Sequence, residues 1–188
     1  MKRKIGLMGS AAEVSALPNC EFLQLQAQDL GRAIAKSGSV LLTGATSGLV
    51  YEVGKAARAN HGFHIGVSPA ANHLEHRERF RLPHDACDVI IYTGFGLKGR
   101  NVVLVRSCDI VLFISGAMGS LNEFTIAHDE GKIMGCLTGT GGVADQSTYL
   151  IEQFSNTRSL VIQESNPQNL VDRCIEVVDL QEVDRSQS

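Results

Sequence analysis

Short apolar runs recur along this chain, and most are bounded by glycine or another turn-forming residue. They consist mainly of Val, Ile, Leu and Phe, which favour strands, and they show little alternation with polar residues. Strands that are apolar throughout are typical of a parallel sheet covered on both faces. The runs occupy residues 5–8, 40–43, 63–67, 89–92, 110–114, 133–137 and 160–162.

Helix-compatible segments separate most of these runs, at residues 21–36, 49–60, 100–107, 121–131, 147–154 and 167–178. This alternation predicts an α/β fold: a doubly wound, Rossmann-like, mostly parallel sheet of about seven strands with helices on both faces. In such sheets ligands bind beyond the carboxyl ends of the strands. The loops that leave the strands are therefore the places to look for a site.

Composition sets the broad class of protein. The 188 residues show no linker-like shift, so we expect one domain over 1–180 and a polar tail at 181–188. A net charge of -3 argues against nucleic acid as a partner. No apolar run is long enough to cross a membrane and no signal peptide is evident, so we expect a cytoplasmic protein. The five cysteines include no Cys-x-x-Cys pair, which favours reduced structural thiols.

Residues 68–85 interrupt the alternation and lack clear periodicity. They contain His73, His76 and His84, whose spacing fits no helix-borne pair of metal ligands, so no metal is expected. Several arginines make the segment partly basic. We expect a mobile flap over an anionic ligand, with a solvated excursion as the alternative.

The loops after the first two predicted strands are rich in glycine and small hydroxyls: Gly9, Ser10, Gly44, Thr46, Ser47 and Gly48. Each loop alone is explained by a tight strand-to-helix turn with a hydroxyl cap. At one edge of one sheet, however, their N–H groups and hydroxyls together favour binding of phosphate or ribose.

The loop after the fourth predicted strand opens with Thr93 and Gly94 and matches Gly-x-Gly-x-x-Gly. The next strand ends without the carboxylate that a dinucleotide site requires, which argues against a dehydrogenase. Arg100 stands where a P-loop has lysine, and no Ser or Thr follows it, which argues against an NTPase. At a predicted helix start, Arg100 is either an exposed side chain or a guanidinium directed at a bound anion.

The loop after the fifth predicted strand comprises Gly116, Ala117, Met118, Gly119 and Ser120. Glycines at a helix N-terminus let peptide N–H groups approach a phosphate. Glu123 follows about one turn into the helix, where its carboxylate could act on the ligand. Ser120 and Glu123 also fit a capping box, which explains the glutamate without any chemistry and is favoured by the spacing alone.

Residues 115–123 resemble the Pro-Gly-Gly-x-Gly-Thr-x-x-Glu signature of the Lonely Guy family, phosphoribohydrolases long labelled as lysine decarboxylases. Gly116, Gly119 and Glu123 match, whereas the proline and the second glycine are absent. Arg100 stands where the family has an Arg-Lys pair, and the first two loops are also similar. Over about residues 5–137 the chain most resembles uncharacterised Rossmann-like members of this group and molybdenum-cofactor carrier proteins.

The resemblance implies cleavage of the N-glycosidic bond of a nucleoside 5′-monophosphate, with Arg100 and Glu123 as catalytic side chains. The alternative is a non-catalytic carrier or sensor of a phosphorylated ligand such as molybdenum cofactor. In both cases the expected partner is a phosphorylated, nucleotide-like small molecule, with no separate cofactor. The family also suggests a homodimer or higher homo-oligomer.

Overall fold

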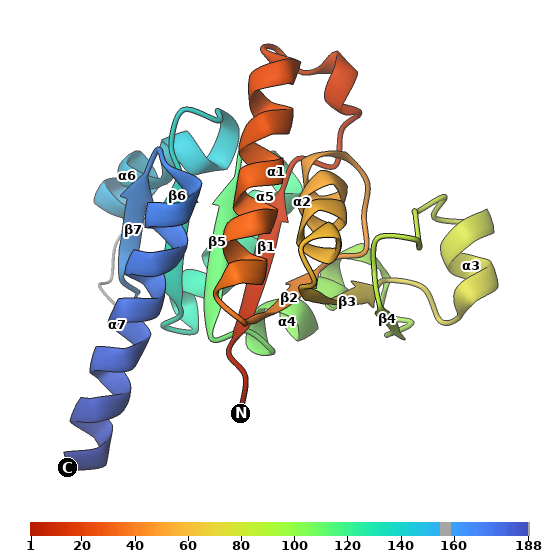
Figure 1. Ribbon diagram of the computed structural model, residues 1–188. Helices are drawn as coiled ribbons and strands as arrows, with labels where there is room; N and C mark the ends of the chain where they lie inside the picture. Colours follow the sequence, from red (N-terminus) through yellow and green to blue (C-terminus); the bar gives the residue numbers. More distant parts are fainter. Residues whose placement is uncertain (155–158, 188) are drawn as a thin grey trace.

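The predicted α/β fold is confirmed. The structure is a computed structural model that describes residues 1–154 and 159–187. Its seven-stranded sheet is parallel throughout, in the order β4-β3-β2-β1-β5-β6-β7 (Figure 1). The strands are β1 (Lys4–Gly9), β2 (Val40–Thr43), β3 (Phe63–Ser68), β4 (Val89–Tyr92), β5 (Ile110–Ile114), β6 (Ile133–Leu137) and β7 (Val161–Glu164).

Helices cover both faces of the sheet, which is what its apolar strands require. They are α1 (Cys20–Lys36), α2 (Gly48–Ala59), α3 (His73–Glu78), α4 (Gly96–Arg106), α5 (Met118–Asp129), α6 (Gly142–Phe154) and α7 (Pro167–Gln187), with a short 3-10 turn η1 (Val14–Ala16). Buried side chains of α1, α2 and α7 pack on one face, and those of α4, α5 and α6 on the other.

β5 shows how one strand contributes to both cores. Ile110, Leu112 and Ile114 pack on the face with α1, α2 and α7, whereas Val111 and Phe113 pack on the face with α4, α5 and α6. Successive side chains of a strand point to opposite faces, so a strand between two helical layers is apolar at every position. This arrangement explains why the run at 110–114 carries no polar residue.

The order of the strands reverses between β1 and β5. From β1 the chain winds outward through β2, β3 and β4, then returns to the other side of β1 with β5 (Figure 1). The helices that follow β1 and β5 lie on opposite faces of the sheet, so the loops at these two strand ends diverge. A crevice at such a switch point is the usual ligand site of an open α/β sheet.

Several predicted boundaries are wrong. α4 begins at Gly96 rather than residue 100, because the left-handed residues Gly94 (φ 69°) and Gly96 (φ 66°) turn the chain earlier. Arg100 therefore lies in the second turn of α4, not at its start. At the other end of the chain, α7 continues through Gln187, so the polar tail expected at 181–188 is helical as far as the described residues reach.

The segment 68–85 contains a helix and internal hydrogen bonds, which were not expected of a mobile flap. It contains α3, which lies beyond β4 at the side of the sheet (Figure 1). His76 of α3 is fully buried, with Nδ1 2.8 Å from Ser68 Oγ and Nε2 3.0 Å from the Pro83 carbonyl. The segment folds around this histidine instead of extending over the cavity described below, and none of its residues lines that cavity.

Candidate functional site

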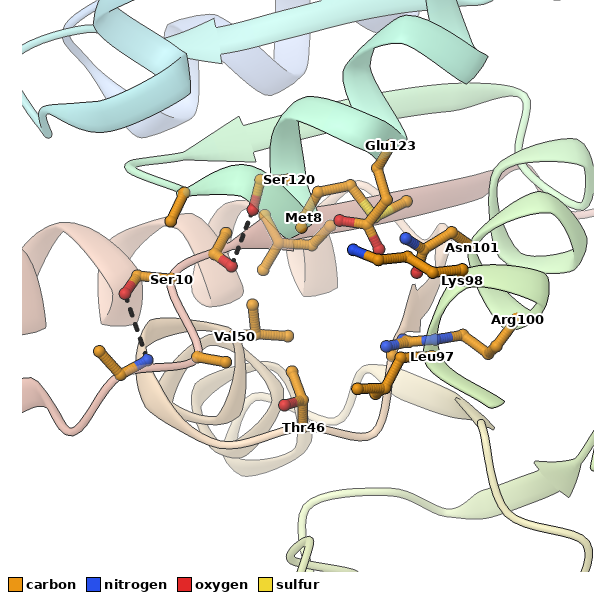
Figure 2. A pocket seen from close by; sticks show the side chains of 17 residues that line it. Met8, Ser10, Thr46, Val50, Leu97, Lys98, Arg100, Asn101, Ser120 and Glu123 are labelled. Carbon is orange, nitrogen blue, oxygen red and sulfur yellow. Dashed lines mark hydrogen bonds between the residues drawn. The ribbon is translucent and has the colours of Figure 1, made fainter. Parts of the chain in front are cut away.

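A cavity of about 310 Å³ lies at the carboxyl ends of β1 and β5 (Figure 2). Two sets of residues form its polar walls. The loop wall consists of residues 9–12, Gly44 and Thr46, from the loops after β1 and β2. The helix wall consists of Lys98, Arg100 and Asn101 of α4 and Glu123 of α5. The remaining lining residues are Leu7, Met8, Val50, Leu97, Ala117, Gly119 and Ser120.

Most of the predicted site residues meet at this cavity, and some do not. Those that line it are Gly9, Ser10, Gly44, Thr46, Arg100, Ala117, Gly119, Ser120 and Glu123. Those outside its lining are Ser47, Gly48, Thr93, Gly94, Gly116 and Met118. The sequence prediction missed Lys98, which precedes the helix start expected at residue 100, and it gave Asn101 no role in the site. A helix that starts at Gly96 places Leu97, Arg100 and Asn101 on one face at spacings of three and four.

The glycine loops after β1 and β2 are fastened to each other. Ser47 Oγ donates to the Ala11 carbonyl at 2.7 Å, and Leu49 N donates to the Ser10 carbonyl at 3.0 Å. Gly48 has φ 71°, and a Cβ there would overlap the Ser10 carbonyl oxygen and lie 2.5 Å from that of Ala12. Ser47 and Gly48 thus hold the loop wall in place without lining the cavity themselves.

The loop after β5 is held in a similar way. Gly116 has φ 107°, and its carbonyl accepts from Val143 N at 3.0 Å, while the Ser115 carbonyl accepts from Ala144 N at 3.1 Å. These bonds join the loop to the first turn of α6. Gly116 therefore supplies a backbone conformation and, through its missing side chain, a close approach to Ser120 of α5, rather than a surface of the cavity.

The capping box predicted for Ser120 and Glu123 is wrong. α5 starts at Met118 with Ala117 as its N-cap, so Ser120 lies inside the first turn. Its hydroxyl donates to the Gly9 carbonyl at 3.0 Å and ties α5 to the end of β1 (Figure 2). The N–H groups of Gly119 and Ser120 precede the first helical bond, from Leu121 N, and bond to no other group in the described part of the chain.

Thr93 and Gly94 lie outside the cavity, where the loop after β4 contacts the loop after β3. Thr93 Oγ1 donates to the Ser68 carbonyl at 2.7 Å, and Gly94 N donates to the Ala70 carbonyl at 2.9 Å. These bonds fasten the loop after β4 to the loop after β3. The Gly-x-Gly-x-x-Gly match therefore reflects a turn between β4 and α4.

Arg100 is the most unusual residue of the cavity. Its side chain extends from α4 toward the cavity (Figure 2), and the residue is only 6% exposed. Within residues 1–154 and 159–187 it makes no hydrogen bond or ion pair, and its buried Nε has no acceptor. Burial lowers the pKa of the guanidinium, partly offset by the carboxylate of Glu123. A buried cation without a partner is unfavourable, so this position calls for an anion.

Glu123 is the carboxylate of the helix wall and is 7% exposed. Burial raises its pKa to about 7, while the positive charges of Arg100 and Lys98 act in the opposite direction. Asn101 is also buried, and its amide orientation follows from its surroundings. With Nδ2 facing Glu123, it donates to Oε1 at 3.1 Å and to the Leu97 carbonyl at 3.0 Å. Near neutral pH this carboxyl group can therefore gain or lose a proton.

The described residues offer neither a metal cluster nor a membrane span. No group of three or more His, Cys, Asp or Glu side chains among them is arranged to hold a metal ion. None of the helices in that part of the chain combines the length and apolar character needed to span a bilayer.

Fold and site together define a Rossmann-like protein with a small-molecule cavity at its topological switch point. The model of the SLOG cluster4 family matches residues 2–171. The chain belongs to this family, which confirms the resemblance seen in its glycine motifs.

Individual relatives agree with this assignment. An uncharacterized protein of Archaeoglobus fulgidus is 31% identical over 103 residues, which are 55% of this chain and only 62% of that relative. Among solved structures, TM1055, a structural genomics target, has a TM-score of 0.79 at 25% identity and covers 95% of this chain and 99% of its own. The molybdenum cofactor binding protein of Rippkaea orientalis has a TM-score of 0.75 at 29% identity, covering 95% and 98%.

Proposed function

We propose that this protein binds a phosphorylated, nucleotide-like small molecule in the switch-point cavity and holds its phosphate on Arg100. The observation that carries the proposal is the buried guanidinium, which makes no hydrogen bond or ion pair with the described part of the chain. A guanidinium presents several N–H donors in one plane and matches phosphate oxygens in a bidentate way. A bound phosphate would supply the acceptors that Arg100 lacks.

The surroundings of Arg100 support the same ligand. Lys98 adds a second positive charge, and the free N–H groups of Gly119 and Ser120 add neutral donors at the start of α5. Leu97, which lines the cavity and is 52% exposed, offers an apolar surface against which a flat ring could pack. The cavity therefore combines a cationic end, suited to a phosphate, with a place for an aromatic heterocycle.

Transport or sensing of the ligand is the role we favour. The likeness to the molybdenum cofactor binding protein of Rippkaea orientalis supports a phosphorylated pterin as one candidate cargo. Such a cargo requires a cavity with an anion site and an apolar wall, and it requires no reactive group. The two features that a carrier or sensor needs, an anion site and an apolar wall, are those described above for the cavity.

Phosphoribohydrolase activity is a second candidate, and Glu123 favours it. Its side chain lines the cavity, it has no capping role, and its pKa of about 7 suits proton transfer near neutral pH. In this reaction the bond between the base nitrogen and the ribose carbon breaks, and its electron pair leaves with the base. The carboxylate would stabilise the cationic sugar or take a proton from the attacking water.

A panel of nucleoside 5′-monophosphates and the matching nucleosides tests the binding proposal. Calorimetry should detect binding of at least one monophosphate and much weaker binding of its nucleoside. Arg100→Ala should lose this preference, and Arg79→Ala is its matched control, since Arg79 is exposed just after α3 and paired with Glu75 at 2.5 Å. Equal affinity for each monophosphate and its nucleoside would contradict a phosphate site.

Chromatography of the same mixtures separates the two candidate functions. Tight binding without free base supports a carrier or sensor. Release of free base and ribose 5-phosphate supports the hydrolase, and Glu123→Gln should then lower the rate by roughly two orders of magnitude or more. Turnover by the Gln variant at the wild-type rate would remove Glu123 from the chemistry.

A further inference from the structure

The guanidinium of Arg100 lies directly against the backbone of Gly44. A Cβ built on residue 44 would overlap Nη1 and would lie 2.5 Å from Cζ and 2.8 Å from Nη2. The backbone of Gly44 is outside the left-handed region, so other residues could adopt its conformation. What residue 44 must provide is space, and the space is filled by Arg100.

This contact joins two parts of the cavity that are far apart in sequence. Gly44 directly follows β2 on the loop wall, whereas Arg100 lies in the second turn of α4 on the helix wall. The guanidinium makes no hydrogen bond to the described residues that would fix its place. Packing against the bare backbone of Gly44 is therefore a contact that can fix its position.

We propose that Gly44 is a positioning residue that seats the Arg100 guanidinium and thereby sets where the cavity holds an anion. This inference rests on the proposed function, in which Arg100 binds the phosphate. It differs from the expectation that the glycine loop after β2 itself contacts the phosphate. In that simpler arrangement, a methyl group at residue 44 would weaken binding whether or not Arg100 is present.

A double-mutant cycle separates the two arrangements, with inorganic phosphate as the probe in an NMR titration. Gly44→Ala and Arg100→Ala should each weaken phosphate binding by about tenfold or more. The double variant should bind no more weakly than Arg100→Ala alone, because the methyl group then has no guanidinium to displace. Additive losses, or wild-type affinity in Gly44→Ala, would overturn the proposal.

Chemical rescue adds a readout that a general loss of stability would not produce. Guanidinium chloride at low, non-denaturing concentration should restore part of the phosphate binding of Arg100→Ala, because the free ion can enter the space beside Gly44 that the Arg100 side chain has left. It should not restore binding in the double variant, where the added methyl group at residue 44 would occupy that space. Equal rescue of both variants would contradict a seat at Gly44.

A measurement without any ligand keeps this inference distinct from the proposed function. The Nε–H signal of Arg100, assigned by its loss in Arg100→Ala, should exchange slowly with water in the wild-type protein because the group is buried. In Gly44→Ala the signal should shift and exchange at least about tenfold faster. An unchanged signal would refute the seat even if phosphate binds, and a shifted signal would uphold it even if phosphate does not.

Discussion

The loop wall and the helix wall of the cavity differ in how their polar groups are satisfied. In the loop wall, the Ser10 and Ala11 carbonyls accept hydrogen bonds from the start of α2, and the Gly9 carbonyl accepts from Ser120. In the helix wall, Arg100 is buried without a hydrogen bond or ion pair to the described residues, and burial raises the pKa of Glu123 to about 7. The glycine loops therefore determine the shape of the cavity, whereas α4 and α5 contribute its charged side chains.

The largest effect that we expect concerns the ionisation of Glu123. Burial raises its pKa from 4.5 to about 7, so the folded protein holds this proton more tightly than the unfolded chain does. The contribution of Glu123 to stability should therefore be greatest below about pH 4.5 and should fall by about 3 kcal/mol as the pH rises to about 7. Glu123→Gln should remove this fall.

Urea unfolding of both proteins between about pH 4.5 and pH 8 measures the difference. Other titrating groups are common to the two proteins, so the difference between the curves isolates Glu123. If the free energies of unfolding of the two proteins changed in parallel with pH, ionisation of Glu123 would cost the folded state little. The proposed difference between the loop wall and the helix wall would then be weaker.

A smaller effect is expected for Gly48→Ala, which tests the structural role of the loop wall. The new methyl group must adopt φ 71° and meets the Ser10 and Ala12 carbonyls. We expect a loss of about 2 kcal/mol in the free energy of unfolding. Phosphate affinity, measured where the variant remains folded, should change much less than in Arg100→Ala. The reverse pattern would place Gly48 in the binding site.

The smallest effect is on the pH dependence of binding. Above about pH 7 the ionised Glu123 competes with a bound anion for Arg100 and Lys98, so affinity should fall as the pH rises. Phosphate itself gains charge in this range, and Glu123→Gln supplies the correction. At about pH 8 the wild-type protein should bind up to about tenfold more weakly than Glu123→Gln, with little difference at about pH 6. Matching pH profiles would exclude this competition.

Most of the fold was predictable because its signals are local. Runs such as 110–114 are apolar on both faces, and glycine or turn residues bound them, so strand positions and the parallel sheet follow from sequence alone. Helix starts were less predictable. Gly94 and Gly96 turn the chain by their left-handed conformation, and α5 starts at Met118 without a capping side chain. Nothing in the local pattern distinguishes these starts from the expected ones.

The position of the cavity was predictable, but the chemistry of its lining was less so. The loops after β1, β2 and β5 meet at one cavity, as expected for strands that share a sheet edge. Which residues have free polar groups depends on tertiary contacts, such as those of Ser47 with Ala11 and Ser120 with Gly9. The homo-oligomer, the cytoplasmic location, the domain limits and the exclusion of nucleic acid stay predictions.

The central claim is that Arg100 binds the phosphate of the ligand, and one calorimetric comparison tests it most directly. A nucleoside 5′-monophosphate and its nucleoside are titrated into wild-type protein and Arg100→Ala at equal pH and salt. We predict that the wild-type protein prefers the monophosphate by about thirtyfold or more and that Arg100→Ala loses most of this preference while remaining folded. A variant that keeps the full preference for the monophosphate would contradict the account.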